Sequence, residues 1–281
     1  MENKAGMLYL CATPIGNLED ITLRALRILR EVDAIAAEDT RHTLKLLNHY
    51  EIAKPLISYH EHNKMEKGRE IVGMLKRGMN IALVSDAGMP GISDPGADLA
   101  ALAAEAGIAC TIIPGPSAAL SALVLSGLST KRFAFEGFLP REGRERREQL
   151  ARLKNESRTL IFYESPHRLS DVLKDMHGIL GSRRIALVRE LTKIHEEVIS
   201  LDLKDAAAYY DDKSPRGEYV LVLEGKGSEQ DLPDYGSLTV EEHLKAYMEA
   251  GMDKKEAVKQ VAKDRGIPRN EVYKYSITLK H

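Results

Sequence analysis

Residues 81–96 read IALVSDAGMPGISDPG, and this stretch decides the fold class that we expect. The apolar run at 81–84 predicts a buried strand. A turn rich in Gly, Pro, Ser and Asp follows, and the alanine-rich residues after it predict a helix at about 97–106. In open α/β folds, ligands bind outside the carboxyl ends of the strands, so this turn lies where a site is expected. Asp86 and Asp94 offer acceptors for ribose hydroxyls or an ammonium group, although a purely structural turn explains the spacing equally well.

Four further apolar runs flank this stretch and predict the other strands of the same sheet, at residues 7–12, 32–37, 56–60 and 109–113. The segments between them predict helices. Strands that alternate with helices indicate right-handed βαβ units and a parallel sheet. The pattern continues to about Leu128, so we expect a first α/β domain at residues 1–128.

The composition changes after Leu128 in a way that predicts a second α/β domain, at residues 129–236. An aromatic run at 133–139 and apolar runs at 159–163, 185–189, 195–200 and 218–224 predict a second sheet, which we expect to be mixed. Residues 225–236 contain Gly, Asp and Pro and predict a linker.

The last segment, residues 237–281, has a wholly helical pattern. Helices are expected at about 240–250, 253–265 and 268–279, with Asp253 as the N-cap of the second. Three short helices with a Gly-Ile-Pro turn resemble a helix-turn-helix module. Residues 240–281 carry nine Lys and Arg against seven Asp and Glu. This small excess leaves open whether the segment binds RNA or serves as a packing or dimerisation element.

The composition is that of a globular protein and excludes several classes. The 281 residues carry a formal net charge of −2, so any contact with nucleic acid must come from local patches. Cys11 and Cys110 are too few for a disulfide framework, which indicates a reducing compartment. The sequence has no apolar run near the roughly 20 residues of a membrane span, and its start makes a poor signal peptide. We therefore expect a cytoplasmic protein that does not bind membranes.

Common nucleotide and metal motifs are missing from the sequence. Neither G-x-G-x-x-G after the first strand nor G-x-x-x-x-G-K-[ST] occurs, which argues against a dinucleotide fingerprint and a nucleotide triphosphatase. His60-Glu61-His62 is not H-E-x-x-H, and no cysteine pair has zinc spacing. We therefore expect no metal ion.

Seven motifs in a fixed order indicate a family. They are T-P-I-G-N-L-x-D-I-T at 13–22, E-D-T-R at 38–41, S-D-A-G-x-P-x-I-S-D-P-G at 85–96, P-G-P-S-A at 114–118, G-F-L-P-R at 137–141, E-S-P-H-R at 164–168 and R-E-L-T-K-x-H-E at 189–196. Together they closely resemble the ribosomal RNA small subunit methyltransferase I family of the tetrapyrrole methylase superfamily. The resemblance covers nearly the whole chain. One departure is Glu142, where a lysine is expected, and it removes at most one RNA phosphate contact.

The resemblance implies the class III methyltransferase fold, in which two α/β domains bind S-adenosylmethionine (SAM) in the cleft between them. It implies 2′-O-methylation of a cytidine ribose in the decoding region of 16S rRNA, in the small (30S) ribosomal subunit. It also implies a homodimer, and a C-terminal helix-turn-helix-like segment belongs to this family.

The resemblance also implies positions that approach the methyl donor, largely through backbone. In the first domain these are Pro14, Asp86, Met89, Ser117 and Ala118. On the opposite wall the candidates are Tyr163, Glu190 and Glu218.

A ribose 2′-hydroxyl needs a general base, because it is a poor nucleophile until its proton leaves. Position, rather than the resemblance, selects the candidates: Asp39, Glu38 and His42 after the second strand, then Asp20 and Asp94. Each has a competing structural role. Asp39 could cap a helix, Glu38 could pair with Arg41, and Asp94 could brace its own turn.

Phosphate contacts are expected from an arginine-rich segment and from one arginine near the second strand. Residues 141–154 carry six basic and three acidic residues and predict a surface helix. The candidates for RNA contact are Arg41, Arg141, Arg144, Arg146 and Arg147. A solvated helix face is the alternative for residues 144–147.

Two other functions stay open at this point. A methylase of a small tetrapyrrole or corrin substrate shares the fold, but such a substrate has no use for the arginine-rich segment or the helical tail. A non-catalytic RNA-binding module would not need the polar strand ends at 38–42 and 85–96.

Overall fold

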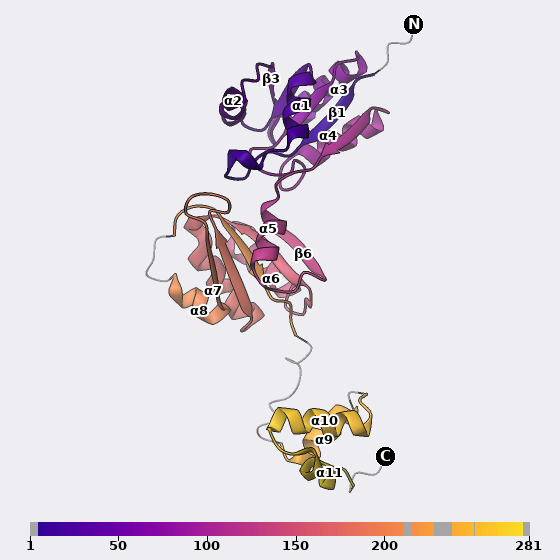
Figure 1. The fold of residues 1–281 in the computed structure, drawn as a ribbon, viewed down its shortest axis with the longest axis vertical. Helices are drawn as coiled ribbons and strands as arrows, with labels where there is room; N and C mark the ends of the chain where they lie inside the picture. The colour runs from indigo at the N-terminus through magenta and orange to yellow at the C-terminus, as the bar shows by residue number, and fades with distance from the viewer. Residues whose placement is uncertain (1–4, 211–214, 228–237, 250, 278–281) are drawn as a thin grey trace. The chain divides into compact units, whose positions relative to one another are not determined.

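The computed structural model describes residues 5–210, 215–227, 238–249 and 251–277. The chain divides into two compact units, residues 1–226 and 227–281. The first unit contains two sheets and the second contains three helices (Figure 1). The boundary expected near residue 128 falls inside the first unit, so the three-domain division stays a prediction. Within the described ranges, no helix is both long enough and apolar enough to cross a bilayer.

The first sheet is parallel throughout, with the strand order β3-β2-β4-β1-β5. Its strands are β1 (Met7–Cys11), β2 (Ala34–Ala37), β3 (Leu56–Ser58), β4 (Ile81–Val84) and β5 (Ala109–Ile113). β2 and β4 are buried at every residue, as apolar runs predict for strands that are covered on both faces. The five expected strands and their parallel arrangement are confirmed.

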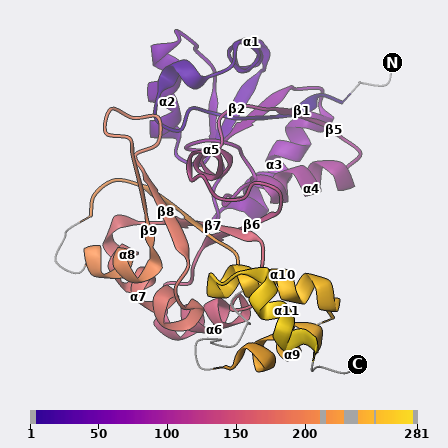
Figure 2. The same ribbon diagram turned by 60° about the horizontal axis from the view of Figure 1, so that its bottom comes forward.

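Helices cover both faces of this sheet (Figure 2): α1 (Leu23–Glu31), α2 (Thr40–His49), α3 (Lys64–Lys76) and α4 (Gly96–Glu105), with a short 3₁₀ turn η1 (Leu18–Asp20) before α1. Leu29 of α1 and Leu47 of α2 belong to the core on one face. Leu75 of α3 and Leu99 of α4 belong to the core on the other. With both faces closed, the loops at the carboxyl ends of the strands are the place for a site.

The second sheet is mixed and has the strand order β6-β7-β10-β8-β9. Its strands are β6 (Phe133–Phe138), β7 (Thr159–Glu164), β8 (Arg184–Arg189), β9 (Glu197–Asp202) and β10 (Tyr219–Leu223). β6 and β7 are parallel, and the other neighbours are antiparallel. The expected mixed sheet is confirmed. However, β9 begins at Glu197 rather than residue 195, because residues 193–196 form a turn in which the N–H of Glu196 donates to the carbonyl of Lys193 at 3.1 Å.

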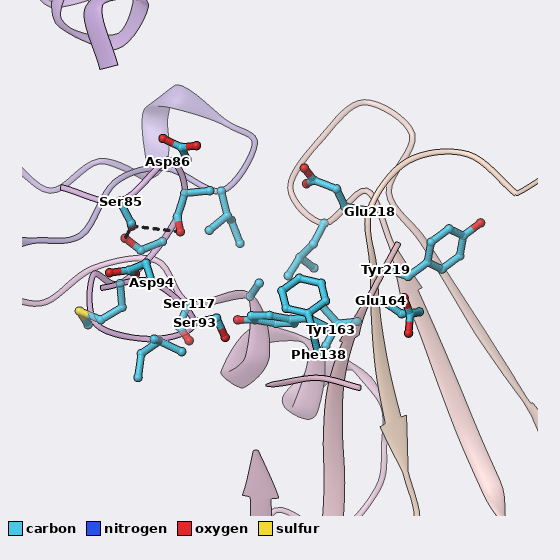
Figure 3. A pocket seen from close by; sticks show the side chains of 18 of the residues that line it. Ser85, Asp86, Ser93, Asp94, Ser117, Phe138, Tyr163, Glu164, Glu218 and Tyr219 are labelled. Carbon is cyan, nitrogen blue, oxygen red and sulfur yellow. Dashed lines mark hydrogen bonds between the residues drawn. The ribbon is translucent and has the colours of Figure 1, made fainter. Parts of the chain in front are cut away.

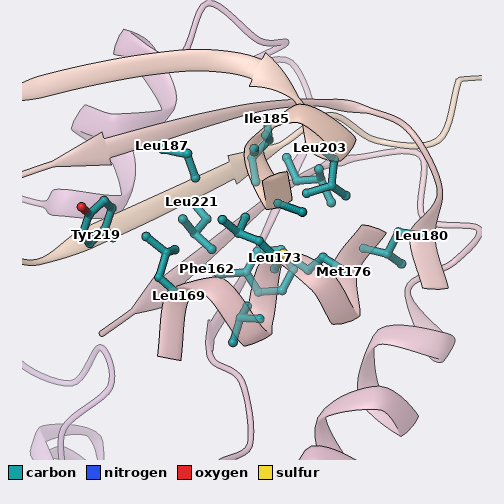
Figure 4. Close-up of a cluster of buried hydrophobic side chains, with 14 of the residues drawn as sticks. Phe162, Leu169, Leu173, Met176, Leu180, Ile185, Leu187, Leu203, Tyr219 and Leu221 are labelled. Atoms are coloured by element: carbon teal, nitrogen blue, oxygen red, sulfur yellow. The ribbon is translucent and has the colours of Figure 1, made fainter. Parts of the chain in front are cut away.

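The second sheet is also covered on both faces. α5 (Ala118–Leu125) contributes to the core on one face, and the other face is covered by α6 (Gly143–Arg152), the short 3₁₀ turn η2 (Pro166–Arg168), α7 (Leu169–Leu180) and α8 (Leu203–Tyr209). Figure 4 shows that core, in which Leu173 and Met176 of α7 pack beside Phe162 and Leu221 of the sheet. Neither α7 nor α8 is among the elements predicted above.

The second unit consists of α9 (Val240–Glu249), α10 (Lys254–Arg265) and α11 (Arg269–Ile277), which pack around Leu244, Tyr247 and Val261. Asp253 caps α10 as expected, because its Oδ1 accepts a hydrogen bond from the N–H of Glu256 at 2.8 Å. The expected end of the third helix, at 279, and most of the expected linker at 225–236 lie outside the described residues.

Candidate functional site

A cavity of about 400 Å³ lies between the two sheets of the first unit (Figure 3). One wall comes from loops that follow strands of the first sheet and includes Asp86, Asp94 and Ser117. The opposite wall comes from the second sheet and includes Tyr163 and Glu218. A volume of this size is typical of small-molecule sites. The loops at the carboxyl ends of parallel strands therefore converge on one cavity, as the fold class predicts.

Six of the eight expected methyl-donor contacts line this cavity, namely Asp86, Met89, Ser117, Ala118, Tyr163 and Glu218. Pro14 lines a second cavity beside it, and Glu190 lines neither. The Glu190 carboxylate instead accepts hydrogen bonds from the N–H of Glu218 and from Lys193 Nζ, both at 3.0 Å. Glu190 therefore supports the wall from behind, and the donor contacts of the other residues stay a prediction.

The loop after β4 is held by hydrogen bonds to the loop after β1. Thr13 and Gly88 exchange both backbone hydrogen bonds, at 2.9 and 3.0 Å, and Thr13 Oγ1 donates to the carbonyl of Ser85 at 3.2 Å. Gly88 has a φ of +77°, and a Cβ there would lie 3.2 Å from Ile15. Glycine is needed at this point because a side chain would be strained and would push the two loops apart.

Asp94 braces the same loop from inside. Its Oδ1 accepts hydrogen bonds from the backbone N–H of Gly91 at 2.9 Å and of Gly96 at 2.7 Å. The hydroxyl of buried Tyr59 donates to the carbonyl of Pro95 at 3.2 Å and holds the end of the loop. Since backbone N–H groups already occupy the Asp94 carboxylate, the geometry favours its bracing role over the role of general base.

Glu38 is the candidate base whose environment fits the task. It lines the cavity, and burial raises its pKa above the ordinary value of 4.5. The carboxylates of Asp86, Asp94 and Glu61 raise the pKa of Glu38 further. Asp86 is itself fixed in place, because the N–H of Asp39 donates to its Oδ1 at 3.0 Å. A carboxylate with a raised pKa that faces a cavity is typical of a general base.

The neighbouring Asp39 has the structural role that competed with catalysis. It is the N-cap of α2, and its Oδ1 accepts a hydrogen bond from the N–H of Arg41 at 2.8 Å. Its carboxylate also binds the Arg41 guanidinium through two hydrogen bonds of 3.1 and 2.8 Å, and these interactions hold the pKa of Asp39 well below its usual range. Neither Asp39 nor the exposed Asp20 lines either of these two cavities, whereas His42 lines the second one. The geometry therefore favours Glu38.

Aromatic side chains make the opposite wall largely apolar. The ring of Tyr163 meets Phe135 and Phe138 edge to face, with centroids 4.9 and 5.5 Å apart. Burial raises the pKa of the Tyr163 hydroxyl, so this side chain is neutral. The cavity thus has an apolar, aromatic side and an acidic side, an arrangement that fits a ligand with an aromatic part and a positive charge.

Two residues to which the sequence alone assigns no role hold this wall together. Arg168 Nη2 donates to the carbonyls of Leu139 and Pro140 at 2.8 and 3.0 Å, and it lies 3.4 Å from Oε2 of Glu164. Glu164 is buried, and burial raises its pKa. The link ties the end of β6 to the end of β7. It gives a structural role to Glu164 and Arg168 of the E-S-P-H-R motif and holds the main chain of the G-F-L-P-R motif. Glu164 ends a strand and Arg168 ends a 3₁₀ turn, so helical spacing rules do not predict this contact from the sequence.

A second cavity, of about 440 Å³, adjoins the first. The two share four lining residues: Ile15, Asp86, Ala87 and Glu218. The second cavity also has basic side chains on its walls, namely His42 and Lys45 of α2 and Lys193 of the loop before β9. In the described ranges, no group of three or more His, Cys, Asp or Glu side chains is placed to hold a metal ion.

The arginine-rich segment forms α6 as expected, but the RNA contact predicted for Arg146 is wrong. The Arg146 side chain is only 10% exposed and pairs with Asp175 of α7 at 2.6 Å. Its guanidinium therefore packs between two helices and is not available to a phosphate. Four of the candidates are exposed and stay predicted RNA contacts: Arg41, Arg141, Arg144 and Arg147.

Comparisons with known proteins point to one family. The model of the tetrapyrrole (corrin/porphyrin) methylases matches residues 7–207. The ribosomal RNA small subunit methyltransferase I of Halalkalibacterium halodurans is 52% identical over 270 residues, which cover 95% of this chain and 93% of that protein. The protein of the same name from Bacillus subtilis is 49% identical, with coverage of 95% and 93%, and that from Escherichia coli O157:H7 is 45% identical, with coverage of 98% and 96%.

Solved structures share the fold at low sequence identity. The methyltransferase CobJ has a TM-score of 0.61 at 18% identity and covers 79% of this chain and 95% of its own. A uroporphyrin-III C-methyl transferase from Thermus thermophilus, complexed with S-adenyl homocysteine, has a TM-score of 0.56 at 19% identity, with coverage of 78% and 97%. The expected tetrapyrrole methylase-like fold is thus confirmed. Because the family model matches most of the chain and the relatives match its sequence over nearly its whole length, the chain belongs to the ribosomal RNA small subunit methyltransferase I family of the tetrapyrrole methylases.

Proposed function

We propose that the protein transfers a methyl group from SAM to the ribose 2′-oxygen of a cytidine in the decoding region of 16S rRNA, within the 30S ribosomal subunit. Relatives that are 45–52% identical are named as small-subunit rRNA methyltransferases. The observation that carries the chemistry is the Glu38 carboxylate with a raised pKa in the cavity between the sheets. Since the proposed acceptor is a ribosomal subunit, we place the protein in the cytoplasm.

The first cavity fits SAM in its chemistry. When bound, SAM supplies an electrophilic methyl group on a positively charged sulfur. Glu38 and Asp86 offer the negative charge that such a cation favours, and the aromatic rings of Phe138 and Tyr163 offer a surface for its uncharged parts. The rigid loop after β4 adds backbone groups at fixed positions.

The residues of the chain orient the acceptor and accept a proton. Methyl transfer is an in-line displacement, so the ribose oxygen must lie opposite the departing sulfur. Positioning of this kind contributes roughly 7–11 kcal/mol to lowering the barrier. As the new O–C bond forms and the S–C bond breaks, the Glu38 carboxylate takes the hydroxyl proton, and S-adenosylhomocysteine is the leaving product.

A single assay tests this function. Purified protein and tritiated SAM are incubated in three separate reactions, with 30S subunits, with naked 16S rRNA or with a corrin precursor. We expect label in 30S subunits alone, and nuclease digestion with mass spectrometry should place it on a 2′-O-methylcytidine. Label in the corrin would instead identify a methylase of small tetrapyrroles. RNA binding without any label would identify a non-catalytic RNA-binding module.

The pH dependence of kcat/KM should report Glu38. A general base acts only when it is deprotonated, so activity should rise with pH through the pKa of Glu38. Because burial and three neighbouring carboxylates raise that pKa, the acid limb should lie above pH 4.5. Initial rates over a pH series at SAM concentrations well below its KM measure it, because kcat/KM for SAM reports the free enzyme. An acid limb at or below pH 4.5 would contradict the assignment.

We also propose that the protein forms a homodimer through the exposed face of α5 and the edge strand β5. The side chains of Leu120, Val124 and Leu125 are 50%, 71% and 47% exposed, and Ile112 of β5 is 45% exposed. Leu120 and Val124 are spaced i, i+4 and share one face of α5, and large exposed apolar side chains are typical of an interface between subunits. The family resemblance implies a second copy of this chain as the partner, and the choice of this face is our own proposal.

Val124→Glu should raise the dimer dissociation constant at least about ten-fold, because a charge would be buried in the apolar contact. Sedimentation velocity over a concentration series measures the change. Met65→Glu is the matched control, since Met65 is 63% exposed on α3, and it should leave the mass unchanged. Equal masses for Val124→Glu and wild type would exclude this face.

A further inference from the structure

The second cavity lies beside the first, and the methyl donor proposed for the first cavity leaves the second without a role. The shared residues Ile15, Asp86, Ala87 and Glu218 make the two volumes neighbours. Among the expected donor contacts, Pro14 lines only the second cavity. One of its walls is a single face of α2, where His42, Lys45 and Leu46 are spaced i, i+3 and i+4.

The two cavities differ in charge: the first is acidic, whereas the second balances two carboxylates, Asp86 and Glu218, with Lys45 and Lys193. The first is lined by five acidic side chains and, among the described residues, by no lysine or arginine: Glu38, Asp86, Asp94, Glu164 and Glu218. The second adds Lys45, Lys193 and His42. Glu190 and Glu218 already bind Lys193 Nζ, at 3.0 and 2.9 Å. Lys45 is exposed and has no ion pair with another described residue, so its ammonium group is available to an anion.

We infer that the second cavity binds the acceptor nucleotide, with Lys45 and His42 on a phosphodiester oxygen beside the reactive ribose. This inference rests on the proposed function. The arrangement of charges supports this inference. A cationic donor suits the acidic first cavity, and an anionic RNA backbone suits the basic wall that α2 gives the second cavity. The ribose between them then lies at the shared wall, next to the cavity that Glu38 lines.

Lys45→Gln tests the inference, with Lys76→Gln as its control. Both lysines are exposed on helices, so both variants should fold, and Lys76 lies on α3 away from both cavities. Circular dichroism checks the fold. Fluorescence anisotropy measures the affinity for a labelled single-stranded oligoribonucleotide at several salt concentrations. Titration calorimetry measures the affinity for SAM, and initial rates give KM and kcat for 30S subunits.

We expect Lys45→Gln to weaken RNA binding about ten-fold, because a charge-assisted contact is lost. The slope of log K against log salt should fall by about 0.7, the value for one phosphate on a single strand. KM for 30S subunits should rise while kcat and the SAM affinity stay near wild type, and Lys76→Gln should match wild type throughout.

Two results would overturn the inference. One is a Lys45→Gln protein with wild-type RNA affinity and salt slope. The other is a parallel loss of SAM affinity, which would assign Lys45 to the donor. Failure of the proposed function looks different. In that case the wild-type protein would label no rRNA, while Lys45→Gln would still lose RNA affinity, and the subsite would stand without the reaction.

Discussion

Replacing Glu38 by glutamine should reduce methyl transfer about 10²–10⁴-fold, the contribution typical of a positioned general base. Glutamine keeps the size of the side chain but cannot accept the hydroxyl proton. Glu38 lines the donor cavity and its pKa is raised, chiefly by burial. Single-turnover rates with 30S subunits at saturating SAM measure the loss, and calorimetry should show that SAM still binds, with an affinity reduced by the loss of one of two nearby negative charges. The acid limb of the pH profile should vanish in this variant.

Two controls separate proton acceptance from charge and from local stability. Glu61→Gln removes one of the negative charges that raise the pKa of Glu38 but keeps the base, so the acid limb should move toward lower pH while the plateau rate is kept. Asp39→Ala removes the cap of α2, which costs about 0.5–2 kcal/mol of stability, but it should leave most of the turnover. A wild-type rate for Glu38→Gln, together with a lost rate for Asp39→Ala, would reverse the assignment.

The sequence predicts that the loops converge on one site, but not which of the adjacent residues Glu38 and Asp39 faces that site. Apolar runs locate β1, β2, β4 and β5, and the parallel arrangement then places their polar carboxyl ends at one edge. Glu38 and Asp39 share that edge in the sequence. Which one lines the cavity depends on where α2 begins, because the N-cap position takes Asp39 into hydrogen bonds with Arg41. Helix boundaries of this precision are not readable from a pattern.

Helical spacing in the sequence indicates that Arg146 is buried, which the prediction of an RNA contact overlooks. Arg146, Leu150 and Leu153 are spaced i, i+4 and i+7, which is one face of a helix, and Arg146 and Leu150 are buried. A count of charges treats every arginine of α6 as exposed, whereas the periodicity places Arg146 on the inner face. Its partner Asp175 is 29 residues away on α7, and sequence spacing alone cannot identify such a contact.

The missed helix α7 has a readable signal, but the short α8 does not. Leu169, Val172, Leu173, Met176 and Leu180 follow helical spacing, and all five belong to the buried core on this face of the second sheet. α8 has only seven residues and is rich in alanine, so its helix depends on packing against α7 and the sheet rather than on its own pattern. The cover that α7 provides over the second sheet was therefore predictable from the sequence, whereas the part that α8 provides was not.

Asp94→Ala should weaken SAM binding on the order of 100-fold, because the loop after β4 would lose its internal brace. The Asp94 carboxylate accepts hydrogen bonds from Gly91 and Gly96, and hydrogen bonds to charged groups contribute about 1.5–3 kcal/mol. The same loop carries Asp86 and Met89 to the cavity. Calorimetry measures the loss of SAM affinity, and thermal unfolding should show that the rest of the first unit stays folded.

Asp94→Asn distinguishes a brace from a general base. The Asn Oδ1 can still accept from both backbone N–H groups, so a brace predicts nearly wild-type SAM affinity and turnover, whereas a base predicts intact binding with lost turnover. Asp98→Ala is the control for a nearby carboxylate, since Asp98 pairs with Lys64 at the surface, where such pairs contribute about 0–1 kcal/mol. Asp94→Asn also removes one of the charges that raise the pKa of Glu38. Its acid limb should therefore shift to lower pH while its plateau rate is kept, and a fallen plateau with SAM still bound would make Asp94 the base.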